Sequence, residues 1–288
     1  MTISCVIVNY NDAVTTKKLV RRIESFYSLD YVVVVDNKSL DDSIAQLTAL
    51  VSPKVVLLEA EKNGGYGFGN NLGIKYAYEK LKSNYVLIAN PDIEFDESCL
   101  QKLLDSLKKN EKAAISAGPQ INVDGRPWQD VSVWKYILNM SLFFDEWLHI
   151  RSYSHKFFEG KQECLVYAVP GSMLLVDAKK MVEVGGYDED FFLYYEEHVL
   201  AEKMKKAGYG TVFRLDAGYI HNHHVSIRKA FKKWGPQRLL RCKSCMLFLK
   251  KYKNVSCYTL LLAKLFVQYV KIEMFFYDFY RWIKPLKK

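Results

Sequence analysis

Two apolar segments of the sequence each lead into an acidic residue. Asp92 closely follows residues 85–89, and Asp36 ends residues 31–36, which contain four consecutive valines. In an open α/β sheet, ligands bind beyond the carboxyl ends of the strands, so an acid there can hold a cation or a substrate hydroxyl. The alternative for residues 90–92 is a simple turn, because Asn, Pro and Asp all favour turns.

A glycine-rich segment, residues 63–73, leads into a predicted helix. The four glycines within residues 64–69 would let backbone amides approach an anion, and the helix N-terminus would add a favourable dipole. The spacing matches neither the dinucleotide-binding nor the Walker pattern, and a flexible turn is the alternative. Farther along, residues 187–198 place five acids among aromatic residues.

The surrounding sequence alternates apolar strands with amphipathic helices, which predicts an α/β fold. The strand at 85–89 is expected to be buried on both faces of a parallel sheet. Strands are predicted at residues 3–9, 31–36, 54–58, 85–89, 113–117, 171–177 and 211–214. Helices are predicted after the capping pair Asn11 and Asp12, and at residues 44–51, 71–82, 98–109, 178–184 and 200–207.

Residues 120–163 lack a clear period and are rich in Trp and Phe. Binding residues are concentrated on irregular segments that a scaffold positions, so we predict that this segment faces the substrate. The alternative is that its aromatic residues pack against the C-terminal part of the chain.

Charge is distributed unevenly along the chain. The formal net charge is +9, and residues 217–288 contain sixteen Lys and Arg but only two acids. The body is therefore mildly acidic and the tail strongly basic, which indicates a tail that meets an anionic surface, either membrane or nucleic acid. Half of the residues are hydrophobic, and this excludes disorder as the overall state.

The N-terminal residues lack a basic segment and a small-residue cleavage site, so no signal peptide is predicted. The six cysteines are too scattered for a disulfide framework, which fits a reducing cytoplasm. Cys242 and Cys245 form a single pair without a nearby ligand histidine. Incidental thiols on a helix are favoured there over a zinc site.

The order and spacing of several short motifs make residues 3–250 resemble the family 2 glycosyltransferases with the GT-A fold. Within that family the sequence is most similar to bacterial rhamnosyltransferases and related enzymes of surface-polysaccharide biosynthesis. The motifs are residues 6–11, 35–39, 63–71, 90–92, 171–173, 185–197 and 221–226. The resemblance implies an α/β protein with a mostly parallel sheet flanked by helices and a C-terminal helical extension.

The resemblance also implies a division into two regions. Residues 1–226 would form the catalytic domain, with a donor half at 1–118 and an acceptor half at 119–226. Residues 227–288 would form a basic, amphipathic helical region.

The donor site implied by the resemblance binds a nucleoside-diphosphate sugar. Asp36 would accept a hydrogen bond from the pyrimidine ring, with Asn9 and Tyr10 lining the base pocket. Asp92 stands at the last position of the family's DxD element, which holds Mg²⁺ or Mn²⁺ against the diphosphate, and Asn90 replaces the first acid. The other residues assigned to donor binding are Asn37, Gly65, Asn70, Asn71 and Arg228.

Glu197 falls at the position of the family's catalytic base, which is normally Asp, and the resemblance implies an inverting mechanism. The adjacent Glu196, also assigned to the catalytic site, would raise the pKa of that base. The alternative is that the two acids only support the dipole of a helix N-terminus. His221 matches a family histidine near the diphosphate and the metal, and His223 or His224 could take its place by a shift in register.

The prediction is therefore metal-assisted, inverting transfer of a sugar from a UDP- or dTDP-linked donor. The expected acceptor is a lipid-linked or growing polysaccharide, as in capsule or cell-wall assembly. A nucleotidyltransferase is the first alternative, although such enzymes usually carry a glycine-rich loop and a basic residue directly after the first strand. A protein that binds nucleic acid through its tail is less favoured, because the acidic body lacks a recognised reader motif.

The C-terminal region combines a basic cluster with an apolar stripe. Residues 227–254 contain ten Lys and Arg and no acid. Beyond them, apolar residues recur at spacings of three and four along one helix: Tyr258, Leu262, Leu265, Tyr269, Ile272, Phe276, Phe279 and Ile283. Charged residues within this stretch argue against a transmembrane span.

Two partners suit such a helix. We favour an anionic membrane surface, because the basic cluster would add attraction to anionic lipid. A packing or homodimer seam is the alternative, since the spacing also suits a coiled coil. The expected location is the cytoplasm, peripheral on the inner face of the plasma membrane.

Overall fold

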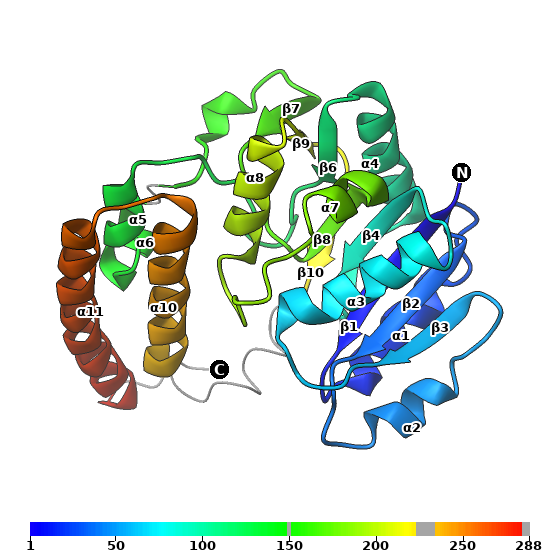
Figure 1. Ribbon diagram of the computed structural model, residues 1–288, viewed down its shortest axis with the longest axis horizontal. Coiled ribbons are helices and arrows are strands. Elements are labelled where there is room, and N and C mark those ends of the chain that lie inside the picture. Colours follow the sequence, from blue (N-terminus) through cyan, green and yellow to red (C-terminus); the bar gives the residue numbers. More distant parts are fainter. Residues whose placement is uncertain (149–150, 223–233, 284–288) are drawn as a thin grey trace.

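The computed structural model describes residues 1–148, 151–222 and 234–283, which form a central sheet covered by helices and a separate group of C-terminal helices (Figure 1). The main sheet has eight strands in the order β3-β2-β1-β4-β8-β6-β9-β7. Its strands are β1 (Ile3–Asn9), β2 (Tyr31–Asp36), β3 (Val55–Glu59), β4 (Tyr85–Ala89), β6 (Ala113–Ala117), β7 (Glu163–Val166), β8 (Met173–Asp177) and β9 (Gly210–Arg214). All the strands predicted from the sequence are present, and β7 is an addition.

The strand directions correct one expectation. β4 is buried and pairs in parallel with β1, as predicted, but its other neighbour, β8, runs antiparallel to it. β7 also runs antiparallel to its neighbour β9. A second, two-stranded sheet pairs β5 (Ile93–Glu94) with β10 (Ile220–His221), and neither of these short strands was predicted.

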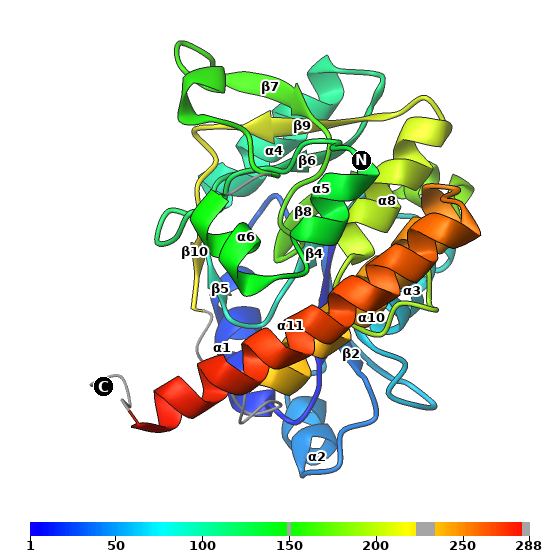
Figure 2. The same cartoon turned by 90° about the vertical axis from the view of Figure 1, so that its left-hand side faces the viewer.

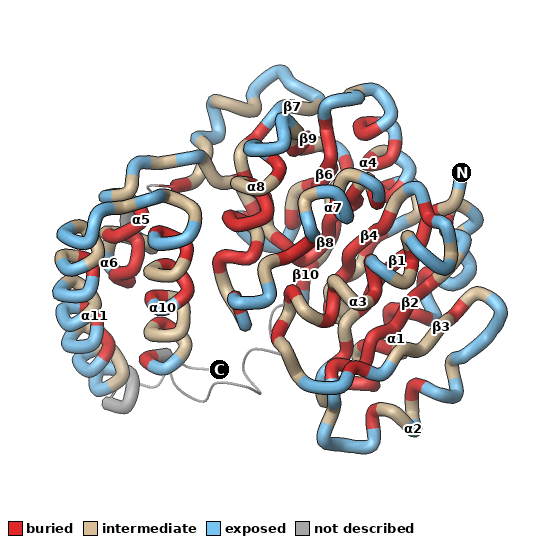
Figure 3. The backbone as a smooth tube through the Cα atoms, in the orientation of Figure 1, coloured by how far each residue is buried: buried red, intermediate tan, exposed pale blue. Residues whose placement is uncertain are grey.

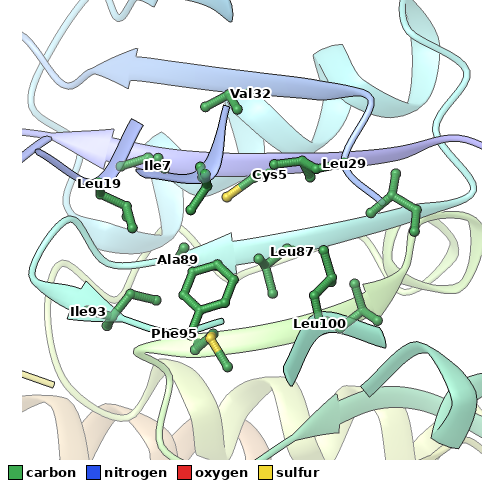
Figure 4. Packing of buried hydrophobic residues seen from close by; sticks show 14 of the residues in the cluster. Cys5, Ile7, Leu19, Leu29, Val32, Leu87, Ala89, Ile93, Phe95 and Leu100 are labelled. Carbon is green, nitrogen blue, oxygen red and sulfur yellow. The ribbon is translucent and has the colours of Figure 1, made fainter. Parts of the chain in front are cut away.

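The two faces of the main sheet are covered by different helices. One face packs on α1 (Ala13–Ile23), α2 (Ser43–Thr48) and α4 (Glu97–Lys109), and Figure 4 shows the buried side chains of this layer. The other face packs on α3 (Tyr66–Glu79), α7 (Ala178–Glu183) and α8 (Glu196–Lys206). In β1, Cys5 and Ile7 point to the first face and Val6 to the second, the alternation expected of a strand buried on both faces.

Two helices begin earlier than predicted. α3 starts at Tyr66 rather than near residue 71, so Gly67, Gly69 and Gly73 lie inside the helix. A Cβ at Gly69 would lie 2.8 Å from Val8 of β1, so this glycine lets the helix approach the sheet closely. α8 starts at Glu196 rather than at residue 200.

A third cluster of buried residues joins segments that are far apart in the sequence. α5 (Val133–Leu138) and α6 (Leu142–Leu148) pack against α10 (Trp234–Tyr252) and α11 (Cys257–Ile283). Tyr136, Ile137 and Met140 are buried here, so this part of residues 120–163 packs against the tail, as in the alternative interpretation. A 3₁₀ turn, His155–Phe157, lies in the rest of that segment, and β7 begins at its last residue.

Much of the described basic cluster is neutralised within the protein. Arg238 and Arg241 both bind Asp145, at 2.8 and 2.5 Å. Lys251 pairs with Asp188 and Asp190, and Lys253 with Asp130 and Glu202. These contacts attach α10 to the rest of the protein. The tail's formal charge therefore overstates what is available to an external anion.

Within the described part of the chain, no helix has both the length and the apolar character needed to cross a membrane. The predicted boundary at residues 226 and 227 lies outside the described residues.

Candidate active site

The carboxyl ends of β1, β2 and β4 meet at one edge of the sheet, and the predicted donor residues lie there. Asp36 ends β2, directly beside Asn9 at the end of β1. Its two carboxylate oxygens accept hydrogen bonds from Asn9 Nδ2 at 2.8 Å and from the backbone and hydroxyl of Ser39 at 2.8 and 2.6 Å. Asp36 therefore holds the loop after β2 in addition to any contact it makes with a ligand.

Asn9 and Tyr10 differ in their access to solvent. Asn9 is fully buried, and its Oδ1 accepts a hydrogen bond from Thr16 of α1. Its side chain therefore links α1 to Asp36 and presents no surface to a ligand. Tyr10 is 43% exposed at the same edge. Of the two, Tyr10 is the side chain with a surface that can contact a base.

Asn37 has one polar atom that the described residues leave unpaired. Its Nδ2 donates to Asn63 Oδ1 and to the carbonyl of Gly65, at 3.1 and 2.9 Å. Its Oδ1 is buried and has no hydrogen-bond partner among the described side chains and backbone groups. Since buried acceptors are normally paired, this oxygen is suited to receive an N–H donor from a ligand.

The start of α3 is tied to the loop that precedes α8. Gly65 has a φ of +91°, and a Cβ on it would lie 2.2 Å from the carbonyl oxygen of Phe192, so only glycine fits. Asn70 is buried and donates to the carbonyl of Tyr66. Asn71 spans to the same loop, bonding both the N–H and the carbonyl of Tyr187. The two asparagines thus hold the backbone of the first turn of α3 and of the loop that precedes α8.

Asp92 and His221, the two predicted metal ligands, lie 3.1 Å apart between Oδ1 and Nε2, and both side chains are buried. The pairing of β10 with β5 produces this contact, because it places His221 opposite Ile93. Behind the imidazole, Gln120 Nε2 lies 3.4 Å from His221 Nδ1 and 2.8 Å from Ser172 Oγ. Tyr219 completes this buried network, 2.6 Å from Ser172.

The pair fits part of a cation site. A carboxylate oxygen and an imidazole nitrogen are both ligands for Mn²⁺, and Asp92 also suits Mg²⁺. The described residues contain no group of three or more His, Cys, Asp or Glu that could hold a metal. The donor set therefore suits a cation whose remaining ligands are diphosphate oxygens and water. Asn90 lies beside the pair, and its backbone N–H donates to the carbonyl of Ser172 at 2.8 Å.

Residues 171 and 172 connect this pair to the predicted base. Gly171 N donates to Glu197 Oε1 at 3.2 Å, while its carbonyl accepts from the hydroxyl of Tyr66 at 2.6 Å. A Cβ at Gly171 would lie 2.8 Å from Glu197 Oε1, so the glycine admits the carboxylate. The next residue, Ser172, belongs to the network behind His221. The two halves of the site thus meet at one dipeptide.

Glu196 and Glu197 occupy the first turn of α8, and their surroundings separate their pKa values. Burial and the neighbouring Glu197 raise the pKa of Glu196 well above the usual range, and its Oε1 has no partner among the described residues. Burial also raises the pKa of Glu197, but the Gly171 amide and the positive charges of Arg151 and Arg241 oppose the shift. The pKa of Glu196 is thus raised further than that of Glu197, so Glu197 is the member of the pair that gives up its proton more readily.

The backbone just before this pair is strained. Tyr194 and Tyr195 have φ values of 70° and 73°, in the left-handed region that non-glycine residues rarely adopt. Tyr195 is buried, and Tyr194 is held through its hydroxyl by Gln237 of α10 at 2.6 Å. Strain of this kind persists only where the surroundings impose it, and here the C-terminal helices help to impose it.

A buried cation lies beyond the base. Arg151 is 6% exposed and donates from Nη1 to His198 Nε2 at 3.2 Å. The guanidinium can only donate, so His198 Nδ1 carries the proton, and burial lowers the pKa of this histidine well below its usual value. Trp128 stacks on His198 with ring centroids 4.9 Å apart. No described carboxylate pairs directly with Arg151, although its charge acts on Glu197.

Arg228, His223 and His224 lie outside the described residues. The sequence did not identify Gln120, Ser172, Tyr66, Arg151 or His198 as part of the site. Their contacts depend on tertiary structure. The available signals were the motifs at 63–71 and 171–173, which contain Tyr66 and Ser172, the acidic segment 187–198, which ends at His198, and the aromatic composition of residues 120–163.

Several known proteins resemble this chain in sequence, and others resemble it in architecture. The chain is 28% identical over 228 residues to the low-salt glycan biosynthesis hexosyltransferase Agl10 of Haloferax volcanii, covering 77% of this chain and 68% of that protein. It is 27% identical over 205 residues to the N-acetylglucosaminyl-diphospho-decaprenol L-rhamnosyltransferase of Mycobacterium tuberculosis, covering 66% of each. The chain thus spans about two thirds of these relatives.

The solved structure of mannosyltransferase PcManGT from Pyrobaculum calidifontis, in complex with GDP-Man and Mn²⁺, superposes with a TM-score of 0.60. Identity is 15%, and the match covers 88% of this chain and 64% of that one, so it shows the fold. The predicted GT-A fold is confirmed. The sequence model of glycosyl transferase family 2 matches residues 4–179, more than half of the chain, and the chain therefore belongs to this family of glycosyltransferases.

Proposed function

We propose that the protein transfers a sugar, with inversion, from a UDP- or dTDP-linked donor to a lipid-linked or growing polysaccharide. One observation carries the proposal. The carboxylate of Glu197 is held by Gly171 at the same sheet edge as the Asp92–His221 pair, through the adjacent Ser172. A base and a cation site on one edge are what displacement of a diphosphate by a hydroxyl requires.

The donor's base is proposed to lie against Tyr10, with Asp36 and Asn37 Oδ1 as acceptors for its N–H groups. Two features support this placement: the exposed ring of Tyr10 and the unpaired, buried Oδ1 of Asn37. The activities for which the relatives are named, hexosyl and rhamnosyl transfer, support a sugar donor.

Asp92 and His221 would hold the Mg²⁺ or Mn²⁺ ion. When bound, the cation offsets negative charge on the departing diphosphate. PcManGT carries Mn²⁺ with its nucleotide sugar, which supports a divalent ion here. Gln120, behind the imidazole, would fix the orientation of His221. Arg228 remains a predicted contact of the diphosphate.

The chemical step proposed for Glu197 is proton transfer. Its carboxylate takes the proton from the acceptor hydroxyl while that oxygen forms a bond to the anomeric carbon. The bond from this carbon to the diphosphate breaks on the opposite face, and the nucleoside diphosphate leaves with the electron pair. Burial and the adjacent Glu197 raise the pKa of Glu196, and its carboxyl is not the one that Gly171 holds, so the role of base is proposed for Glu197.

The test is a thermal-shift panel of UDP-, dTDP- and GDP-sugars, with and without Mn²⁺, followed by product analysis. A ligand at one hundred times its Kd stabilises by about 2.7 kcal/mol, which is easily measured. NMR of the product must show an inverted anomeric configuration. Stabilisation by none of the donors, or a retained configuration, would refute the proposal. Release of pyrophosphate from a nucleoside triphosphate would instead identify a nucleotidyltransferase.

A further inference from the structure

The C-terminal helix α11 has apolar residues on two sides. Its inner side packs against α10 and α6 through Ala263, Phe266, Val270 and Met274. The opposite side, here called the outer face, points away from the protein, and Figures 1 and 2 show α11 outermost, with α10 between it and the sheet. The outer face consists of Tyr258, Leu261, Leu265, Tyr269, Ile272, Phe275 and Phe276, each between 46% and 69% exposed.

The exposure is continuous along the helix. The outer-face residues recur at spacings of three and four, so they form one stripe over about five turns. Figure 3 shows the exposed outer turns of α11. An apolar stripe of this length on a protein surface marks a contact with another molecule or with a membrane.

Both acids of α11 are turned away from the outer face. Glu273 caps the start of α6, accepting hydrogen bonds from Ser141 Oγ and from the backbone N–H groups of Leu142 and Phe143 at 2.9 to 3.1 Å. Asp278 accepts from the N–H of Gly235 in the first turn of α10, at 3.3 Å. The two acids therefore stabilise neighbouring helix termini and leave the outer face without negative charge.

The charges that remain beside the stripe are positive. Lys264 and Lys271 are both exposed, and Lys271 donates to Gln268 of the same helix. Within residues 257–280 no carboxylate other than the two helix-capping acids occurs. The outer face is thus apolar with a basic border, the arrangement of a helix that lies in a membrane interface.

This charge pattern favours one of the two partners considered from the sequence, a membrane surface, over the other, a second copy of the chain. A two-fold homodimer would place the outer face against itself, bringing lysines together with no acid to pair them. An anionic bilayer supplies phosphate groups for the lysines and acyl chains for the aromatic residues. We propose that α11 lies flat on the anionic surface of the plasma membrane, with its outer face in the boundary between head groups and acyl chains.

The inference deepens the proposed function, because it brings the site to a lipid-linked acceptor. It also changes the origin of the attraction. Of the six basic residues of the 227–254 cluster that the structure describes, four are paired within the protein. The proposed contact is therefore placed on α11 itself, through Lys264, Lys271 and the aromatic stripe.

The test is co-sedimentation of the full chain with vesicles of phosphatidylcholine and phosphatidylglycerol in equal parts, containing no acceptor. The parent should bind these vesicles and not pure phosphatidylcholine. Phe275→Glu with Phe276→Glu should lower the partition coefficient at least about tenfold, because apolar insertion is replaced by repulsion. Lys264→Glu with Lys271→Glu should lower it about thirtyfold or more.

Matched controls alter equally exposed residues elsewhere. Tyr27, which is 98% exposed, is changed to Glu as the apolar control. Lys75→Glu with Lys206→Glu repeats the charge reversal away from α11, and both controls should bind vesicles like the parent. Donor-induced thermal shift in every variant shows that it is folded, independently of lipid binding.

Equal vesicle binding by the parent and the Phe275/Phe276 variant would overturn the proposal. So would a parent dimer, seen by light scattering, that this variant converts to a monomer without changing lipid binding. If the parent shows no donor-induced thermal shift, the proposed function is contradicted, but the result on membrane binding still stands.

Discussion

Replacing Glu197 by Gln removes the proposed base with little change of shape. Glu197 Oε1 accepts the Gly171 N–H at 3.2 Å, and the amide oxygen of Gln can accept the same bond. Gln cannot take a proton at neutral pH, so the acceptor hydroxyl would have to attack without a base. The expected result is a large loss of turnover in an enzyme that binds its donor normally.

The magnitude follows from the role of a positioned base, which contributes about 10²- to 10⁴-fold. At about 1.4 kcal/mol for each factor of ten, this corresponds to a barrier higher by about 3 to 5.5 kcal/mol. The donor's contacts are proposed at Tyr10, Asp36, Asn37 and Asp92, so the donor Kd should change less than about threefold. Removal of one negative charge also lets the pKa of Glu196 fall, but burial keeps it raised.

The assay measures kcat with saturating donor and acceptor, together with donor affinity by calorimetry. Glu196→Gln is the matched control, since it makes the same chemical change one residue earlier. It should cost far less, because Glu196 is not the proposed base and its pKa is raised well above the usual range. Near-parent turnover by Glu197→Gln, or equal losses in the two variants, would refute the assignment of the base.

Three further predictions concern the cation, the pH profile and the tail. Asp92→Asn should lower Mn²⁺-dependent affinity for a nucleoside diphosphate at least about tenfold in a folded protein, and unchanged affinity by calorimetry would remove Asp92 from the site. Arg151→Met should move the acidic limb of the kcat–pH profile to higher pH, because Arg151 opposes the raised pKa of Glu197, and an unmoved limb would contradict this. Asp145→Asn should destabilise the fold by about 3 kcal/mol in urea at pH 7, because it leaves the buried Arg238 and the partly buried Arg241 without their carboxylate. Burial opposes ionisation of Asp145, but Arg241 and Arg238 hold its pKa below the usual range. Its contribution to the free energy of unfolding is therefore present above about pH 4 and is lost as the pH falls further. A stability difference between parent and variant that grows on acidification would contradict this.

Local sequence was sufficient for seven of the eight strands of the main sheet, all but β7. Residues 31–36 and 85–89 are apolar and strongly patterned, and both form strands at the predicted positions. Each ends beside an acid at the carboxyl edge of the sheet, which is where open α/β sheets bind their ligands. The contact of Asp92 with His221, however, was implied only by the resemblance, since the two residues are 129 positions apart.

Glycine content misled the prediction of α3. The four glycines of residues 64–69 were expected to form an anion-binding segment or a flexible turn before the helix. In the structure Gly69 and Gly73 face Val8, Val6 and Val35, and any side chain there would push the helix off the sheet. Sequence alone does not show whether a glycine is needed because a neighbouring strand lies too close for a side chain or because the chain turns there.

The charge of the tail was misread for a related reason. Composition counts every lysine and arginine as available to a partner, whereas partners within the fold depend on tertiary contacts. Asp145 lies in the aromatic segment and binds Arg238 and Arg241 from α10. Only the packing of α5 and α6 on α10 brings these residues together, and neither helix was predicted.

The direction of β8 determines how the two halves of the site meet. Because β8 runs antiparallel to β4, its first residues lie at the edge where β4 ends, with Met173 opposite Ala89. Had β8 been parallel, Gly171 and Ser172 would lie at the opposite edge, a full strand length from Asp92. The reversal lets Gly171 hold the carboxylate of Glu197 while Ser172 joins the network behind His221. A conservative change at Ser172 therefore acts on the cation pair and the base together, although this residue is neither the base nor a proposed cation ligand.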